Sequence, residues 1–170
     1  MPQKRPHTRL PRVQWITAEG CFDMTRFPID PVLKQVLSED GEAFRSGCRV
    51  LGAMADHGRT EVVVVYLLGL MCWYRDDLHR LSTVIEQLSG AARELEPEKV
   101  GLVADVLAGE LRRVKSSNTT RGYLDTVIRG LALLPKDVAL PRLEDLAADR
   151  SFSQKMRAKL GLAVESLLFR

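Results

Sequence analysis

Aromatic residues are scarce in this sequence, and their scarcity narrows the fold class. Phe, Trp and Tyr make up 6% of the 170 residues, whereas Leu, Val and Ala supply most of the apolar side chains. No segment alternates apolar and polar residues between turn-forming residues, as a half-buried strand would. The composition therefore argues against an aromatic-rich sheet sandwich and favours an all-α fold whose helices pack through aliphatic side chains.

Long apolar runs are also missing. The longest largely apolar stretch, Val62 to Tyr74, has 13 residues, whereas a membrane-spanning helix needs about 20. We expect this stretch to form the most buried helix of the core. The basic start of the chain is followed by prolines and arginines, so no secretory signal is visible. We therefore expect a cytoplasmic protein with no membrane partner.

Cysteine is rare, and its number is odd. Cys21, Cys48 and Cys72 lie far apart and have no metal-binding spacing. Disulfide frameworks use even numbers of cysteines in small secreted chains, so we expect reduced thiols here. Cys48 and Cys72 fall within apolar helical patterns, which predicts that both fill the core.

Recognisable catalytic and metal-binding motifs are absent. His7, His57 and His79 have no partner histidine at the helical spacings that hold a metal ion. The sequence has neither a glycine-rich phosphate loop nor a Gly-x-Ser-x-Gly nucleophile turn. Asp76, Asp77 and His79 are the best acid–base candidates, but two acids at a helix start ordinarily complement the helix dipole. We predict no metal, no cofactor and no catalytic residue, with an enzyme using these three side chains kept as an open alternative.

The net charge of +3 comes from one end of the chain. The first twelve residues contain no acid and four basic residues, Lys4, Arg5, Arg9 and Arg12, so the remaining residues hold one more acid than base. Prolines at positions 2, 6, 11 and 28 predict an extended arm over residues 1–29, which translation from Met24 would largely remove. Residues 30–170 are expected to form one helical domain.

Capping residues and apolar spacing from residue 30 onward predict about eight helices. They are expected near residues 31–38, 41–56, 60–75, 77–95, 97–115, 119–134, 136–148 and 152–168.

Three of these helices share one apolar stripe at an offset of 36 residues. The first stripe is Leu88, Ala91, Ala92 and Leu95, the second is Leu124, Val127, Ile128 and Leu131, and the third is Leu160, Ala163, Val164 and Leu167. Leu51, Met54 and Ala55 form a weaker earlier copy, shifted by one residue. A fixed period of this kind is typical of stacked helix pairs, each of which needs a neighbour to cover its apolar face. An irregular helical bundle is the alternative.

The last pair resembles a HEAT repeat. Leu140, Pro141, Leu143 and Leu146 resemble its first helix, Asp149 its turn, and Met156-Arg157 the start of its second helix. The resemblance implies a right-handed stack of antiparallel helix pairs, an α-solenoid, whose second helices line an inner face. It is loose over residues 60–168 and better over 138–168.

That inner face would carry basic residues at the same period. Arg93 and Arg129 are 36 residues apart, as are Arg121 and Arg157, and Lys155 and Lys159 lie beside the second pair. Stacked arginines can bind phosphates or carboxylates through two hydrogen bonds each. The alternative is a solvated face balanced by Glu94, Asp125 and Glu165.

Two functions follow from these observations. The first is a non-catalytic interaction or scaffolding module that presents its inner helical face to a protein or peptide. The second is a nucleic-acid-associated protein that contacts phosphates through the basic arm and the arginines, as the HEAT-like DNA glycosylases that it distantly resembles would imply. The sequence leaves the oligomeric state open.

Overall fold

The computed structural model describes residues 14–17, 19 and 21–169. Within these residues the chain is helical, and its only strand-like pairing is an isolated antiparallel bridge between Ile16 and Phe22. The all-α prediction is therefore confirmed for this part of the chain. The four basic residues of the predicted arm, Lys4, Arg5, Arg9 and Arg12, lie outside the described residues.

The helices begin and end close to the predicted positions. They are α1 (Ile29–Val36), α2 (Gly41–Met54), α3 (Thr60–Trp73), α4 (Leu78–Ala92), α5 (Pro97–Arg113), α6 (Arg121–Leu133), α7 (Lys136–Ala148) and α8 (Gln154–Leu168), with a π-helical turn η1 (Ala55–Arg59) between α2 and α3. Every boundary lies within three residues of its prediction. Local signals thus suffice to place these helices.

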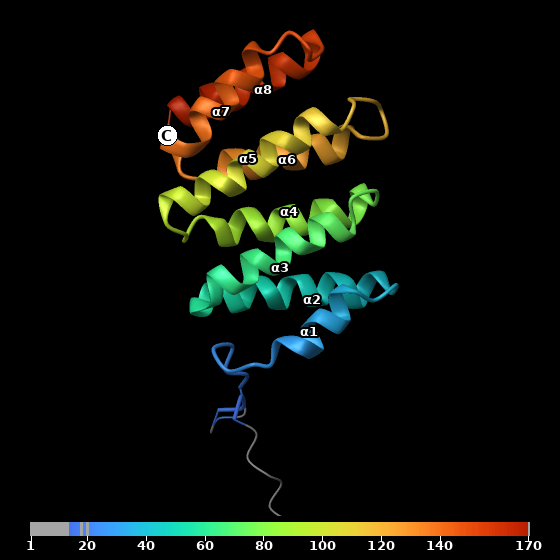
Figure 1. The fold of residues 1–170 in the computed structure, drawn as a ribbon, viewed down its shortest axis with the longest axis vertical. Coiled ribbons are helices and arrows are strands. Elements are labelled where there is room, and N and C mark those ends of the chain that lie inside the picture. Colours follow the sequence, from blue (N-terminus) through green and yellow to red (C-terminus); the bar gives the residue numbers. More distant parts are fainter. Residues whose placement is uncertain (1–13, 18, 20, 170) are drawn as a thin grey trace, which may run out of the picture.

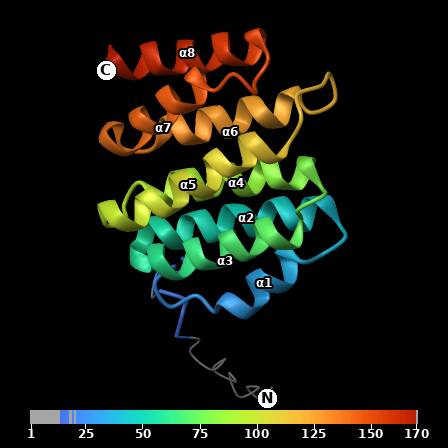
Figure 2. The same ribbon diagram turned by 45° about the horizontal axis from the view of Figure 1, so that its top comes forward.

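The helices pack as successive pairs along the long axis of the molecule, from α1 at one end to α7 and α8 at the other (Figure 1). Each odd-numbered helix contacts the even-numbered helix that follows it. The even-numbered helices also contact one another in order, α2 with α4, α4 with α6, and α6 with α8. Figure 2 shows the same succession from a second direction. The core consequently runs as one cluster through the whole row of even-numbered helices.

The apolar stripes lie along this core. Leu88, Leu124 and Leu160 occupy the same place in their stripes, and all three side chains are fully buried. Ala163 and Val164 on α8 are only partly buried, because no further helix among the described residues packs beyond α8. Burial therefore follows the sequence spacing but weakens at the end of the row.

Helix α3 is not the most buried helix of the core, and this prediction was wrong. Val63, Val64 and Leu67 are buried, but Val65 is 67% exposed and Trp73 is 72% exposed. Helix α3 lies outside the row of even-numbered helices, and among the described elements it contacts only α2, η1 and α4 closely. One side of the helix therefore faces solvent, although no charged residue after Glu61 marks it.

The same geometry corrects the prediction for one cysteine. Cys48 on α2 is fully buried, as expected, whereas Cys72 on α3 is exposed. Cys72 follows the buried Met71 and points to the open side of the helix. The apolar pattern around a residue therefore does not fix its burial when the whole helix is apolar.

A glycine makes the turn between α2 and α3 possible. Gly58 adopts φ 85°, a conformation that other residues rarely tolerate. Nδ1 of the neighbouring His57 lies 2.7 Å from the carbonyl oxygen of Ala53. His57 thereby satisfies a carbonyl at the helix end.

Arg80 connects the first two helix pairs. Its guanidinium donates hydrogen bonds to the carbonyl oxygens of Ser38 (2.7 Å) and Glu39 (2.7 Å) in the loop between α1 and α2. It also lies 4.9 Å from the ring centroids of both Phe44 and Tyr74. One α4 side chain thus holds the loop between α1 and α2 by hydrogen bonds, and its cation–π contacts hold it against Phe44 and Tyr74.

Candidate functional site

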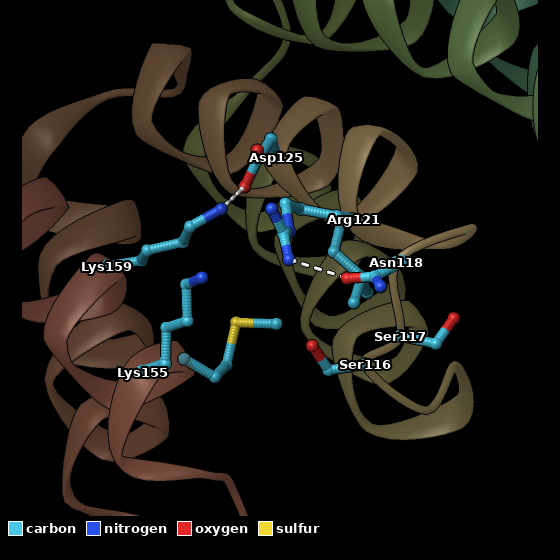
Figure 3. A pocket seen from close by; sticks show the side chains of 9 residues that line it. Ser116, Ser117, Asn118, Arg121, Asp125, Lys155 and Lys159 are labelled. Carbon is cyan, nitrogen blue, oxygen red and sulfur yellow. Dashed lines mark hydrogen bonds and ion pairs between the residues drawn. The ribbon is translucent and has the colours of Figure 1, made fainter.

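A cavity of about 190 Å³ lies between the N-terminal parts of α6 and α8. We call it the α6–α8 cavity, and its lining residues are Ser116, Ser117, Asn118, Arg121, Leu124, Asp125, Lys155, Met156 and Lys159. Figure 3 shows the two lysines approaching from α8, while Arg121 and Asp125 approach from α6. Three of the six predicted binding residues therefore meet at one place.

Helix geometry brings the three cations together. Arg121 is the first residue of α6, and Lys155 is the second residue of α8. Lys159 lies one turn after Lys155, so both lysines share one side of α8. Because α6 and α8 pack against each other with their N-termini at the same edge of the molecule (Figure 1), residues from both first turns reach the same cavity.

The cavity has an excess of positive charge. Lys159 forms an ion pair with Asp125, with 2.5 Å between Nζ and Oδ1. Arg121 donates a hydrogen bond of 2.8 Å to the neutral amide oxygen of Asn118, and within the described residues neither Arg121 nor Lys155 has a carboxylate partner. An anion entering the cavity would therefore meet two cations that no acid already neutralises.

The start of α6 adds to this positive potential. Thr120 precedes the helix, but its side chain does not cap the helix amides. Its hydroxyl instead donates to the Lys115 carbonyl oxygen at 2.7 Å. The first amides of α6 therefore lack a side-chain cap, and the positive end of the helix dipole lies beside Arg121.

Hydrogen bonds within the loop between α5 and α6 fix the other rim of the cavity. The Ser117 amide donates to Thr120 Oγ1 at 2.9 Å, and the Thr120 amide donates back to Ser117 Oγ at 3.2 Å. This reciprocal pair positions Ser116, Ser117 and Asn118 next to the cations (Figure 3). These three residues were not among the predicted binding residues, although their place in a polar loop before α6 was a usable signal.

The other predicted binding residues lie elsewhere. Arg93 follows the last residue of α4 and is exposed, and Arg129 donates to Thr126 Oγ1 at 3.2 Å within α6. Neither of them lines the α6–α8 cavity. Arg157 is half-buried, and its Nε is buried without a hydrogen-bond partner within the described part of the chain. The cavity thus joins Arg121 to the two lysines rather than to Arg157.

One of the three acid–base candidates, Asp77, caps the start of α4. Asp77 accepts a hydrogen bond of 3.0 Å from the Arg80 amide and forms an ion pair of 3.5 Å with the same residue's guanidinium. Asp77 is therefore the N-cap of α4, in agreement with the capping interpretation. Across residues 14–17, 19 and 21–169, no three His, Cys, Asp or Glu side chains gather in an arrangement that could hold a metal ion.

A half-buried network anchors α6 near the cavity. Glu110 on α5 accepts two hydrogen bonds from Arg113, at 2.8 and 2.6 Å, and a third from the Tyr123 hydroxyl on α6. Burial alone would raise the pKa of Glu110, but these bonds outweigh it and hold that pKa below its usual value. Burial raises the pKa of the Tyr123 hydroxyl most, and the hydrogen bond to the Glu110 carboxylate raises it further. The hydroxyl therefore stays protonated and donates to Glu110.

Comparison with known proteins identifies no relative for this chain. No protein-family model, no curated protein and no solved structure matches it. Within the described residues, no helix has both the length and the apolar character needed to cross a membrane.

Proposed function

We propose that this chain is a HEAT-like helical-repeat module that binds an acidic segment of a protein partner along its row of even-numbered helices. The observation that carries the proposal is the α6–α8 cavity, where Arg121 and Lys155 from two successive helices converge without carboxylate partners. An arginine can hold a carboxylate through two parallel hydrogen bonds, and a nearby lysine adds a second charge.

Equivalent burial at a 36-residue spacing supports the repeat. Leu88, Leu124 and Leu160 are each fully buried, and α4, α6 and α8, which carry them, contact one another in order. Among the odd-numbered helices, Arg142 on α7 donates to Asp105 at 2.7 Å and to the Gly101 carbonyl oxygen at 3.2 Å on α5. In this proposal, each pair buries the apolar face of the pair before it.

The size of the cavity supports a side chain as ligand. Sites for cofactors and drug-sized molecules usually have volumes of about 300–1,000 Å³, whereas this cavity has about 190 Å³. The lysine side chains around it are partly exposed, and the Ser117 and Asn118 rim is open to solvent. Such a site suits one anionic group that remains attached to a larger partner.

Nucleic-acid association is the second candidate, because phosphates carry the same charge. The four basic residues near the start of the chain would supply much of the affinity, yet the remaining residues have one more acid than base. Non-specific binding to DNA depends on many cations that release counterions together. A compact group of three cations with one acid favours a short acidic peptide.

Fluorescence anisotropy with the full chain would test the proposal. The probe is a fluorescein-labelled 12-residue peptide of glutamate, glycine and serine, compared with a labelled duplex DNA of similar charge at several salt concentrations. We expect Arg121→Gln/Lys155→Gln to weaken peptide binding about tenfold, because two anion contacts disappear. The matched control Lys34→Gln/Arg45→Gln removes two exposed cations from α1 and α2 and should change the affinity less than twofold.

Two results would contradict the proposal. If the double substitution in the cavity leaves the peptide affinity unchanged, the α6–α8 cavity is not where the peptide binds. Binding of duplex DNA but not of the peptide, with a steep dependence on salt, would replace it with the nucleic-acid alternative.

A further inference from the structure

A second cavity of about 420 Å³ lies beside the α6–α8 cavity. We call it the loop cavity because the loops between α5 and α6 and between α7 and α8 form its walls. Its lining residues are Leu111, Arg112, Val114, Lys115, Ser116, Ser151, Phe152, Ser153 and Met156. Ser116 and Met156 line both cavities, so the two spaces are neighbours.

The loop cavity differs in chemistry from its neighbour. Leu111 and Met156 are buried at its base, and Val114 and Phe152 are half-buried beside them. Its polar lining residues, which are exposed at the rim, are Arg112, Lys115, Ser116, Ser151 and Ser153. An apolar base under a polar rim is the arrangement that accepts a large apolar side chain from a binding partner.

Both walls of the loop cavity are held by local hydrogen bonds. Asp149 Oδ1 accepts from the Ser151 amide at 2.8 Å, and Ser153 Oγ accepts from the Met156 amide at 3.2 Å. Across the cavity, Ser117 and Thr120 bond reciprocally. A ligand would therefore enter a preformed space and would pay little entropy for ordering it.

We propose that the two cavities together recognise one peptide motif, an anionic side chain followed within about three residues by a large apolar side chain such as Leu or Phe. The spacing follows because the cavities share two lining residues and an extended chain advances about 3.3–3.6 Å per residue. Met156 lies between the two groups, and its flexible thioether can adapt to either one. This inference rests on the proposed function and specifies the partner's chemistry.

The chain's own basic arm does not fit this site. Residues 1–12 contain four basic side chains and no acid, so they cannot supply the anion that the α6–α8 cavity attracts. This composition excludes the arm as the occupant, and we assign the site to a segment of a different protein. The anion is a glutamate or aspartate carboxylate, and a phosphoserine probe below tests the alternative of a phosphorylated side chain.

The experiment measures anisotropy of the full chain with a set of labelled peptides on a glycine–serine scaffold. One arm carries two glutamates and the other one phosphoserine, and the position two residues later is Ala, Ser, Leu, Phe or Lys. We expect Leu and Phe peptides to bind about five to ten times more tightly than the Ala peptide, because they bury apolar surface. Tighter binding of the glutamate peptides supports the carboxylate as the anion, whereas tighter binding of the phosphoserine peptides would overturn it.

Phe152→Ala should abolish the preference for Leu and Phe while keeping the dependence on the anion. If Phe152→Ala does not fold, as judged by its circular dichroism spectrum, Val114→Gln at the same cavity takes its place. NMR of methionine labelled with ¹³C at the methyl group gives a readout that needs no variant. The Met156 signal should shift with the Leu peptide far more than with the Ala peptide.

Failure of this inference and failure of the proposed function are distinguishable. If the five peptides of each arm bind equally and the Met156 signal responds to none of them selectively, the loop cavity takes no side chain, although the α6–α8 cavity still binds anions. If no peptide binds in either arm, both proposals are overturned. An apolar preference that persists in both Phe152→Ala and Val114→Gln would also overturn the loop cavity as its cause.

Discussion

The ammonium group of Lys159 lies 2.5 Å from Asp125 Oδ1, and this ion pair joins α8 to α6 at the edge of the α6–α8 cavity. Both side chains are substantially exposed, at 31% and 42%. Pairs of this kind contribute only about 0–1 kcal/mol to stability. The carboxylate of Asp125 therefore matters chiefly because it neutralises one of the three cations that an anionic ligand would meet.

Asp125→Asn should strengthen binding of the glutamate peptide by about two- to fivefold at low salt, because Lys159 becomes free to contact the ligand. The gain should shrink as salt is added. Anisotropy titrations at two salt concentrations would measure both effects, with the exposed Asp145→Asn on α7 as the matched control. Weaker binding by Asp125→Asn than by the control would mean that Asp125 orients Lys159 for the ligand.

Gly130→Ala should destabilise the protein by about 1–3 kcal/mol, because the α4–α6 contact has no room for a methyl group. A Cβ at position 130 would lie 2.5 Å from Ser89 Oγ and 3.1 Å from Ile85 Cγ2. Urea unfolding followed by circular dichroism gives the free energy of unfolding. Gly109→Ala on α5, where a Cβ meets nothing within 4 Å, should instead stabilise by about 0.5–1 kcal/mol. Equal effects of the two substitutions would contradict the close approach of α4 and α6.

Glu110→Gln should lower stability at neutral pH by about 1–3 kcal/mol, because Arg113 and Tyr123 lose a charged acceptor. The folded-state pKa of Glu110 lies below its unfolded value of 4.5. Its stabilising effect is therefore present above pH 4.5 and is lost as the pH falls through the folded-state pKa. Urea titrations between pH 7 and 3 should show the difference between wild type and variant shrinking with acid. The exposed Glu144→Gln on α7 should show no such convergence.

The three cysteines should differ in reactivity. Burial raises the pKa of Cys48 to about 12, and nearby Arg80 offsets only part of this effect. Cys21 and Cys72 are exposed. Iodoacetamide at pH 8 should therefore modify both of them before it modifies Cys48. Peptide mass spectrometry would locate the adducts, and the same reaction in denaturant should modify all three. Protection of Cys72 as complete as that of Cys48 would contradict the open side of α3.

The sequence predicted helix positions well and the burial of α3 poorly, for one physical reason. In α4, α6 and α8 charged residues alternate with apolar ones at helical spacing, so the side that faces the core can be read directly. Between Val62 and Tyr74 no charged residue occurs, and both sides of α3 look alike. Val65 and Trp73 are exposed only because no helix in the described part of the chain packs against that side of α3.

The candidate site divides in the same way. The sequence by itself determined the helices, their apolar stripes and the basic residues near the starts of α6 and α8, because these depend on spacing within one segment. The tertiary structure alone decided that Arg121, Lys155 and Lys159 line one cavity and that Arg157 does not line it. It also decided that the loops add an apolar cavity next to them. Such convergence depends on the offset between packed helices and on the path of the loops, and a periodic pattern along one helix carries no information about either.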